Sequence, residues 1–143
     1  SPVALAVGWL RSLHATTNVQ QLAEELGRIG QMLFFPPNVK GWPGGRAWLN
    51  SATIVGRANL IRRLANGGST KFSAGSLVAA VEQLGGQDTP ATIDRLLELL
   101  VALPVAPRVR GELAQMTTAS GERSRTFADL LHAISLLPEF QLA

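Results

Sequence analysis

The sequence predicts an all-α domain, a compact bundle of about six or seven short helices interrupted by one long segment that is not helical. Three observations support this prediction. Apolar residues recur at spacings of three and four along most of the chain, and residues that cap or break helices bound these runs. No segment shows a sustained alternation of apolar and polar residues, so no strand is expected.

Caps and breakers set the expected helices in order. Three are expected in the first half: residues 1–15, residues 17–33, and residues 51–66 after a cap at Asn50 or Ser51. Four follow: residues 73–84 up to Gly85-Gly86, one from Thr89 that closes at Pro104, one that begins at Pro107, and one that carries apolar residues 127–137. Residues 119–123 are expected to form a polar loop, and residues 138–141 a turn.

Two side-chain patterns give finer expectations about these helices. Gly27 and Gly30 lie on one flank of the second helix, which predicts that a neighbouring backbone comes close there. Arg57, Arg62 and Arg63 fall opposite the apolar stripe of the third helix, which predicts a solvated basic face.

Composition bounds the class of protein. A chain of 143 residues with 46% hydrophobic residues suits one domain, with an aromatic-rich subregion 1–66 and a leucine-rich subregion 73–143. The opening Ser-Pro-Val without a methionine suggests a fragment of a longer protein. The absence of cysteine excludes disulfides and thiolate sites, and no apolar run is long enough to span a membrane. A net charge of +3 gives only weak support for a polyanion partner.

The segment from Phe34 to Asn50 is the most informative stretch of the chain. Three prolines and three glycines prevent a continuous helix, yet the segment holds two of the three tryptophans and two of the five phenylalanines. A flexible linker would be polar, so this loop is expected to be ordered by the burial of Trp42 and Trp48.

No complete catalytic constellation is visible, and neither a metal nor another cofactor is expected. Only two histidines occur, His14 and His132, and neither has a carboxylate three or four residues later. The run from Gly41 to Arg46 lacks the ending of a phosphate-binding loop. An anion site at the following helix start, formed by Arg46 and free amides, is an alternative, but tight turns at the glycines and packing by the tryptophans are favoured. Nucleic acid is not favoured, because no nucleic-acid motif accompanies the basic residues.

The run from Leu33 to Gly45, followed by Trp48-Leu49-Asn50-Ser51 and Arg57, resembles the signature of the bacterial family called domain of unknown function 1800. The resemblance extends over the whole chain, from Ser1-Pro2-Val3 to the closing Leu-Pro-Glu-Phe-Gln. It implies a helical fold, the C-terminal portion of a longer protein, and export to the periplasm or the outside of the cell. It carries over no catalytic residue. Phe35 stands where a polar or acidic residue is common in the family.

These observations lead to one hypothesis and two alternatives. The chain is expected to be a non-catalytic helical module that docks through the loop onto the remaining part of a parent chain or onto another domain. Alternatively, the loop is one wall of an enzyme site for an anionic or carbohydrate-like substrate, or the chain binds polyanions weakly. The candidate binding residues are Phe35, Asn38, Lys40, Trp42, Arg46, Trp48, Asn50 and Arg57.

Overall fold

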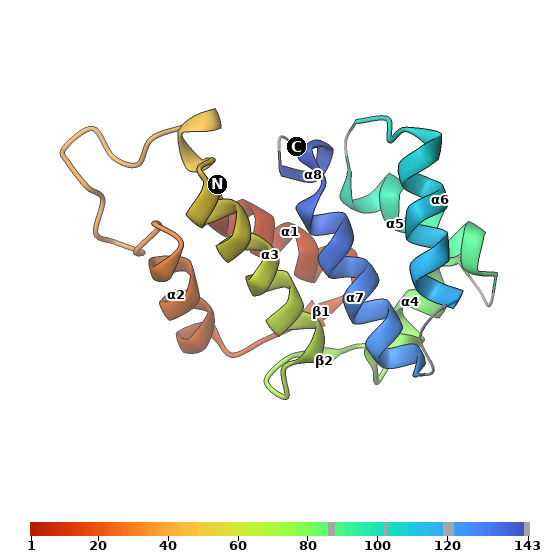
Figure 1. Cartoon of the computed structure of the whole chain (residues 1–143). Coiled ribbons are helices and arrows are strands. Elements are labelled where there is room, and N and C mark those ends of the chain that lie inside the picture. Colours follow the sequence, from red (N-terminus) through yellow and green to blue (C-terminus); the bar gives the residue numbers. More distant parts are fainter. Residues whose placement is uncertain (86–87, 102, 119–121, 142–143) are drawn as a thin grey trace.

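A computed structural model describes residues 1–85, 88–101, 103–118 and 122–141, and it confirms the all-α class (Figure 1). The elements follow the order α1 (Pro2–Ser12), β1 (Ala15–Thr16), α2 (Val19–Arg28), the 3-10 turn η1 (Gly45–Trp48), α3 (Ser51–Asn66), β2 (Lys71–Phe72), α4 (Leu77–Gly85), α5 (Thr89–Leu100), α6 (Pro107–Thr118), α7 (Arg123–Leu136) and α8 (Pro138–Gln141).

Helix α7 is the centre of the bundle. It packs along α3 on one side and α6 on the other, and it also contacts α4 and α8 (Figure 1). Phe127, Leu130, Leu131 and Ile134 of α7 are almost fully buried within one apolar cluster, which also receives side chains from α1, α3 and α5. Residues of both predicted subregions therefore contribute to the same core.

Several helix boundaries match the local signals. The Ser1 side chain caps α1 with Pro2 as the first helical residue, and Pro107 begins α6. Asn50 and Thr53 form a reciprocal capping box at the start of α3, which ends at Asn66 as expected. The predicted polar loop 119–123 and the predicted stop at Gly86 fall in part outside the described residues.

Other boundaries were wrong. Helix α1 ends at Ser12, because His14 takes a left-handed φ of 47° and leads into β1. Strands β1 and β2 pair in antiparallel orientation over two residues each, although no strand was predicted. Helix α4 starts at Leu77 rather than Ser73, because Ser73 donates two hydrogen bonds to the carbonyl of His14. Helix α5 ends at Leu100, before Pro104.

Helix α2 is also shorter than its apolar stripe suggests. It ends at Arg28, and Gly30 follows with a φ of 97°, a conformation that favours glycine. The expected close approach at Gly27 is absent: a Cβ there would meet nothing within 4 Å. The crowded glycine is Gly56 on α3, where a Cβ would lie 2.5 Å from Cγ2 of Ile29.

Candidate functional site

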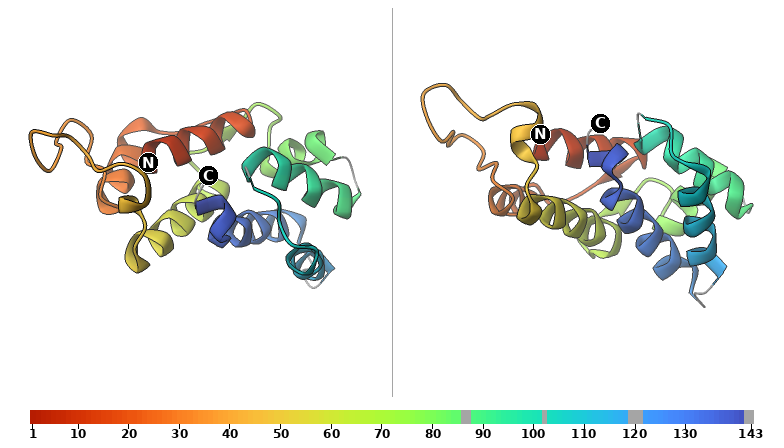
Figure 2. Two further views of the ribbon diagram at one scale, coloured as in Figure 1. Left: turned by 90° about the horizontal axis from the view of Figure 1, so that it is seen from above. Right: turned by 45° about the horizontal axis from the view of Figure 1, so that its top comes forward.

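The segment between α2 and α3 leaves the helical body and returns to it. All views show it projecting beyond the bundle (Figures 1 and 2). The segment has two parts, which we call the loop tip (residues 32–41) and the loop stem (residues 44–50). Gln31 fixes the outgoing chain, because its side-chain oxygen accepts a hydrogen bond of 2.9 Å from the backbone N–H of Val3 in α1.

Backbone turns shape the loop tip. Phe34 has a φ of 66°, and the N–H of Phe35 donates to the carbonyl of Met32. Asn38 organises the far end: its side-chain oxygen accepts from the N–H of Lys40 at 2.8 Å, and its carbonyl accepts from the N–H of Gly41. Asn38 therefore forms an Asx turn, and its side-chain oxygen bonds to the backbone of the loop itself.

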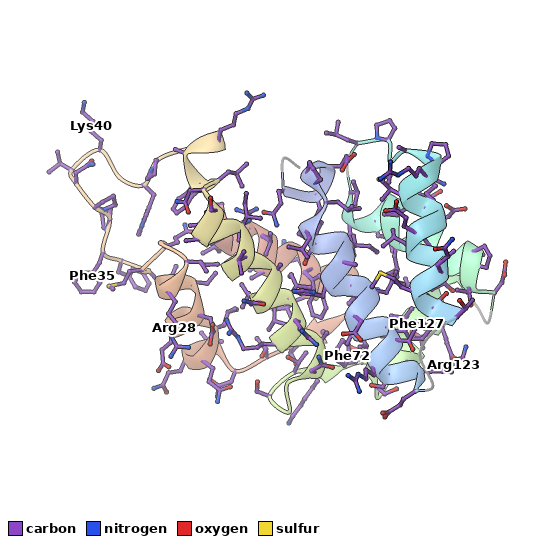
Figure 3. All side chains as sticks on the ribbon, in the orientation of Figure 1. Arg28, Phe35, Lys40, Phe72, Arg123 and Phe127 are labelled. Atoms are coloured by element: carbon purple, nitrogen blue, oxygen red, sulfur yellow. The ribbon has the colours of Figure 1, made fainter. Side chains whose placement is uncertain are left out.

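The loop tip presents its large side chains to water. Phe34 is 90% exposed and Phe35 is 72% exposed, while Met32 and Val39 are exposed as well. Phe35 and Lys40 both point away from the helices (Figure 3). Trp42, which the sequence predicted to pack, is only half-buried.

The loop stem, in contrast, is held against the body. Trp48 at the end of η1 is 7% exposed, and its carbonyl accepts a hydrogen bond of 2.7 Å from the Thr53 hydroxyl. The Asn50 side chain accepts from the N–H of Thr53 and so serves as the cap of α3. The turn of the stem therefore continues directly into the capping structure of α3.

Arg57 lies in an unexpected place. The sequence placed it on a solvated face of α3, but its exposed fraction is 4%, and residues of α1 and α8 line the hollows beside it. Burial lowers the pKa of the Arg57 guanidinium, since the charged form loses hydration. Partial burial of the Ser1 amino group itself, followed by the charge of Arg57, lowers the pKa of that group.

Two hollows meet at Arg57. The larger, about 370 Å³, lies between the loop stem and the residues around α8, and Arg46, Trp48 and Gln141 contribute to its wall. The smaller, about 290 Å³, lies beside α1 and is lined by Trp9, Leu100 and Phe140 among others. The structure thus brings Arg46, Trp48 and Arg57 together, whereas Phe35, Asn38, Lys40 and Trp42 line neither hollow.

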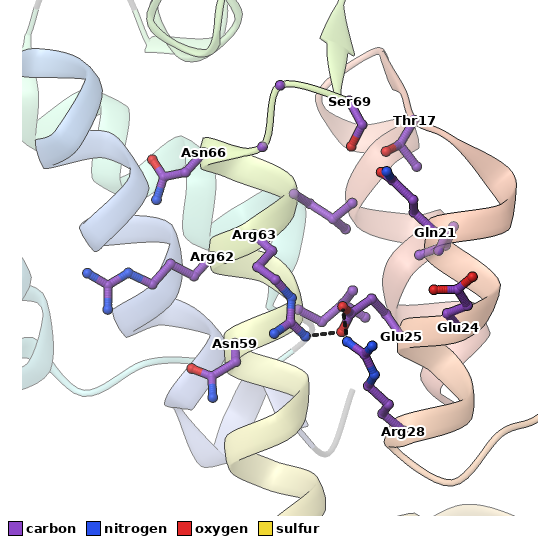
Figure 4. A pocket seen from close by; sticks show the side chains of 15 residues that line it. Thr17, Gln21, Glu24, Glu25, Arg28, Asn59, Arg62, Arg63, Asn66 and Ser69 are labelled. Carbon is purple, nitrogen blue, oxygen red and sulfur yellow. Dashed lines mark hydrogen bonds and ion pairs between the residues drawn. The ribbon is translucent and has the colours of Figure 1, made fainter.

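A third hollow, larger than these two, is a cleft of about 790 Å³ between α2 and α3, and none of the predicted site residues lines it (Figure 4). Glu25 stands in it between two guanidinium groups: it accepts from Arg28 at 2.8 Å and forms a second ion pair with Arg63. Sequence reasoning missed this cleft, because it placed Arg63 on a solvated face and did not pair it with Glu25 of another helix. Whether an arginine on one helix can pair with a glutamate on another depends on how the two helices pack.

The predicted basic cluster on α3 is divided in the structure. Arg63 forms an ion pair with Glu25, and Nη2 of Arg62 lies 3.4 Å from Oδ1 of Asp129. Arg57 is buried. No Asp or Glu occurs between Glu25 and Glu82, a stretch that holds seven of the 13 basic residues. Two of these seven, Lys40 and Arg46, stand on the loop and form no ion pair with another described residue.

The histidines do not form a metal site with other ligands in the part of the chain that the structure describes, where no group of three His, Asp or Glu side chains gathers. His132 on α7 is half-buried. Burial lowers its pKa, the positive charge of Arg62 lowers it further, and Asp129 acts in the opposite direction.

A family model described as "Protein of unknown function (DUF1800)" matches residues 1–142. The chain belongs to the DUF1800 family. The resemblance carried by the loop signature is thereby confirmed, and that signature corresponds in space to the loop tip, the loop stem and the first turns of α3. No curated protein and no solved structure matches the chain. No described helix of this DUF1800 chain combines the length and apolar character needed to cross a bilayer.

Proposed function

We propose that this chain is a non-catalytic helical module that docks through its loop tip onto another protein surface. The observation that carries the proposal is the exposure of Phe34, Phe35 and Val39 on a loop whose backbone is tied by its own turns. Single exposed apolar residues are ordinary, but several on one short projecting segment are typical of an interaction site. Burial of a phenylalanine contributes about 1.5–3 kcal/mol, so two such rings supply much of the driving force for docking.

Charge defines the partner surface further. Lys40 stands on the loop tip without an acidic partner among the described residues, and Arg46 follows on the loop stem. A matching surface is an apolar groove whose rim carries carboxylates, because opposite charges at a rim orient an encounter and speed association. Our proposed partner is the remaining portion of a longer parent chain.

The test is to titrate the separately produced remaining portion of the parent into this chain and to follow binding by calorimetry. Saturable binding is expected for the native chain, and at least tenfold weaker binding for the double variant Phe34→Ser, Phe35→Ser. The matched control is Val19→Ser, Val55→Ser, which removes two exposed apolar side chains from α2 and α3 and is expected to leave binding unchanged.

A charge reversal separates the two parts of the interface. Lys40→Glu is expected to weaken binding moderately. The effect is expected to be larger at low salt, because dissolved ions screen the attraction between Lys40 and a carboxylate at the rim of the partner.

Two outcomes would change the proposal. Binding that is equally weak in the control double variant Val19→Ser, Val55→Ser would contradict docking by the loop tip. Sedimentation of the chain alone provides a second check: a dimer abolished by the Phe34→Ser, Phe35→Ser change would replace the proposed partner by a second copy of the chain.

A further inference from the structure

The sequence left open an anion site formed by Arg46 at the start of α3. The structure moves Arg46 elsewhere, because Asn50 and Thr53 already cap that helix start with each other's side chains. Arg46 instead borders the hollow of about 370 Å³ between the loop stem and α8. The other positive groups of this hollow come from α1 and from the buried side of α3, which are distant from Arg46 in sequence.

Three sources of positive charge converge on this hollow. Arg46 is exposed at its rim, and Arg57 lines it from α3. Ser1 lines it at the N-terminal end of α1, where an amino group and the positive end of the helix dipole coincide. No Asp or Glu is among the described residues that line it. This one-sided set of charges favours a ligand that carries more than one negative charge.

Arg57 contributes through its field more than through contact. Its exposed fraction is 4% and its Nε is sealed from solvent, so little of the guanidinium group is open to a ligand. Burial also weakens the screening of its charge by water, and Arg57 takes part in none of the ion pairs between described residues. The pKa of the Ser1 amino group is lowered by burial and next by the charge of Arg57, so this field extends to Ser1.

The hollow also has an apolar side. Trp48, Leu49 and Leu103 line it, and its volume exceeds that of a single phosphate group. Apolar side chains with a few convergent polar groups are the usual lining of a small-molecule site. The expected ligand therefore joins an anionic group to a compact apolar body.

We propose that this hollow binds a small phosphate monoester. The phosphate lies at Arg46 and Ser1, within the field of Arg57. The organic body lies against Trp48 and Leu103. A monoester carries about −1.5 to −2 charges at pH 7, so it matches several positive groups at once, whereas a carboxylate carries one charge. This site is separate from the loop tip, so it goes beyond the proposed docking function and stands or falls independently of it.

The tryptophans provide a direct readout by nuclear magnetic resonance. Trp48 lines the proposed site, whereas Trp42 lines none of the three hollows. Titration with phenyl phosphate at constant ionic strength is expected to shift the indole N–H signal of Trp48 saturably and to leave that of Trp42 in place. A Trp48 signal that does not respond, or that moves no more than the Trp42 signal, would overturn the site.

Two further ligands test the charge and the apolar body separately. Methyl phenyl phosphate keeps the ring but has one negative charge, and it is expected to bind about fivefold or more weakly than phenyl phosphate. Inorganic phosphate keeps the charge but lacks the ring, and it is expected to bind about fivefold or more weakly as well. Equal affinity for the diester would contradict the preference for a doubly charged group, and equal affinity for inorganic phosphate would contradict the apolar contact.

Substitutions test the positive groups. Arg46→Gln is expected to weaken phenyl phosphate binding about fivefold, because one rim charge is lost. The matched control is Lys40→Gln, which removes the same charge from the loop tip, and its binding is expected to be native. Arg57→Met is expected to weaken binding about tenfold or more, since the poorly screened charge is lost. Because Arg57→Met removes a buried side chain, its fold is checked by circular dichroism, and the Arg46→Gln and Lys40→Gln pair decides by itself. Equal weakening in that pair would refute the site.

A final arm separates the site from the chain ends and from lipid phosphate. The titration is repeated on a chain acetylated at Ser1 and amidated at its carboxyl end, where binding is expected to persist and to remain weaker in Arg46→Gln. Binding that is lost in this chain would assign it to the end groups and overturn the site. Cosedimentation with phosphatidylcholine vesicles that contain phosphatidic acid is not expected. If it occurs and is lost in Arg46→Gln, while phenyl phosphate has no effect on Trp48, a membrane surface replaces the small monoester.

Discussion

Helix α7 and the loop tip both carry bulky apolar side chains, but only α7 buries them. Phe127, Leu130 and Leu131 lie inside the core, whereas Phe34 and Phe35 lie in water. The helix satisfies its own backbone hydrogen bonds and so enters the core freely, while a loop broken by proline and glycine leaves backbone groups that need water or local turns. Similar side chains therefore stabilise the fold in one region and remain available for binding in the other.

Truncating one side chain in each region tests this difference most directly. Leu131→Ala is expected to lower the free energy of unfolding by about 2–5 kcal/mol, because it opens a cavity in a fully packed core. Phe35→Ala is expected to change it by less than about 0.5 kcal/mol, because its ring is already in water. Urea unfolding followed by circular dichroism measures both. Similar losses in the two variants would show that the loop tip packs on the body.

The two tryptophans of the loop segment differ in burial in the same way within one stretch of chain. Trp48→Ala is expected to lower the free energy of unfolding by about 3 kcal/mol, near the lower end for a buried tryptophan, because one side of its ring borders a hollow. Trp42→Ala is expected to cost about 1 kcal/mol or less, since its ring is only half-buried. Thermal unfolding by circular dichroism separates the two variants, and a larger loss in Trp42→Ala than in Trp48→Ala would show that Trp42 is the ring that anchors the loop segment.

The smallest expected effect concerns the pH dependence of the body. The pKa of His132 is lowered in the folded chain, so the unfolded chain binds more protons between that value and the ordinary value of about 6.5. Stability is then highest above pH 6.5 and falls as the pH decreases through this window. His132→Gln is expected to flatten the fall, measured by urea unfolding at several pH values, and His14→Gln is the matched control that keeps the His132 contribution. An unchanged slope in His132→Gln would assign the pH dependence elsewhere.

The sequence alone determined the features that depend on neighbours along the chain. The all-α class, the cap at Ser1, the stop at Asn66 and the helix start at Pro107 were all predicted, and the cap of α3 was predicted at Asn50 or Ser51. So was the family, because the loop signature is a continuous run of residues. Each of these signals is a local hydrogen bond, a fixed φ or a contiguous motif, and so it is complete within a few residues.

Only the tertiary structure decided where individual side chains ended up. Arg57 and Arg63 were indistinguishable in the pattern of α3, yet one is buried beside α1 and α8 and the other reaches Glu25 across a cleft. The pairing of β1 with β2 and the crowding at Gly56 likewise join residues distant in sequence. Helical periodicity gives the face on which a residue lies, but the burial of that face depends on which helices pack against it.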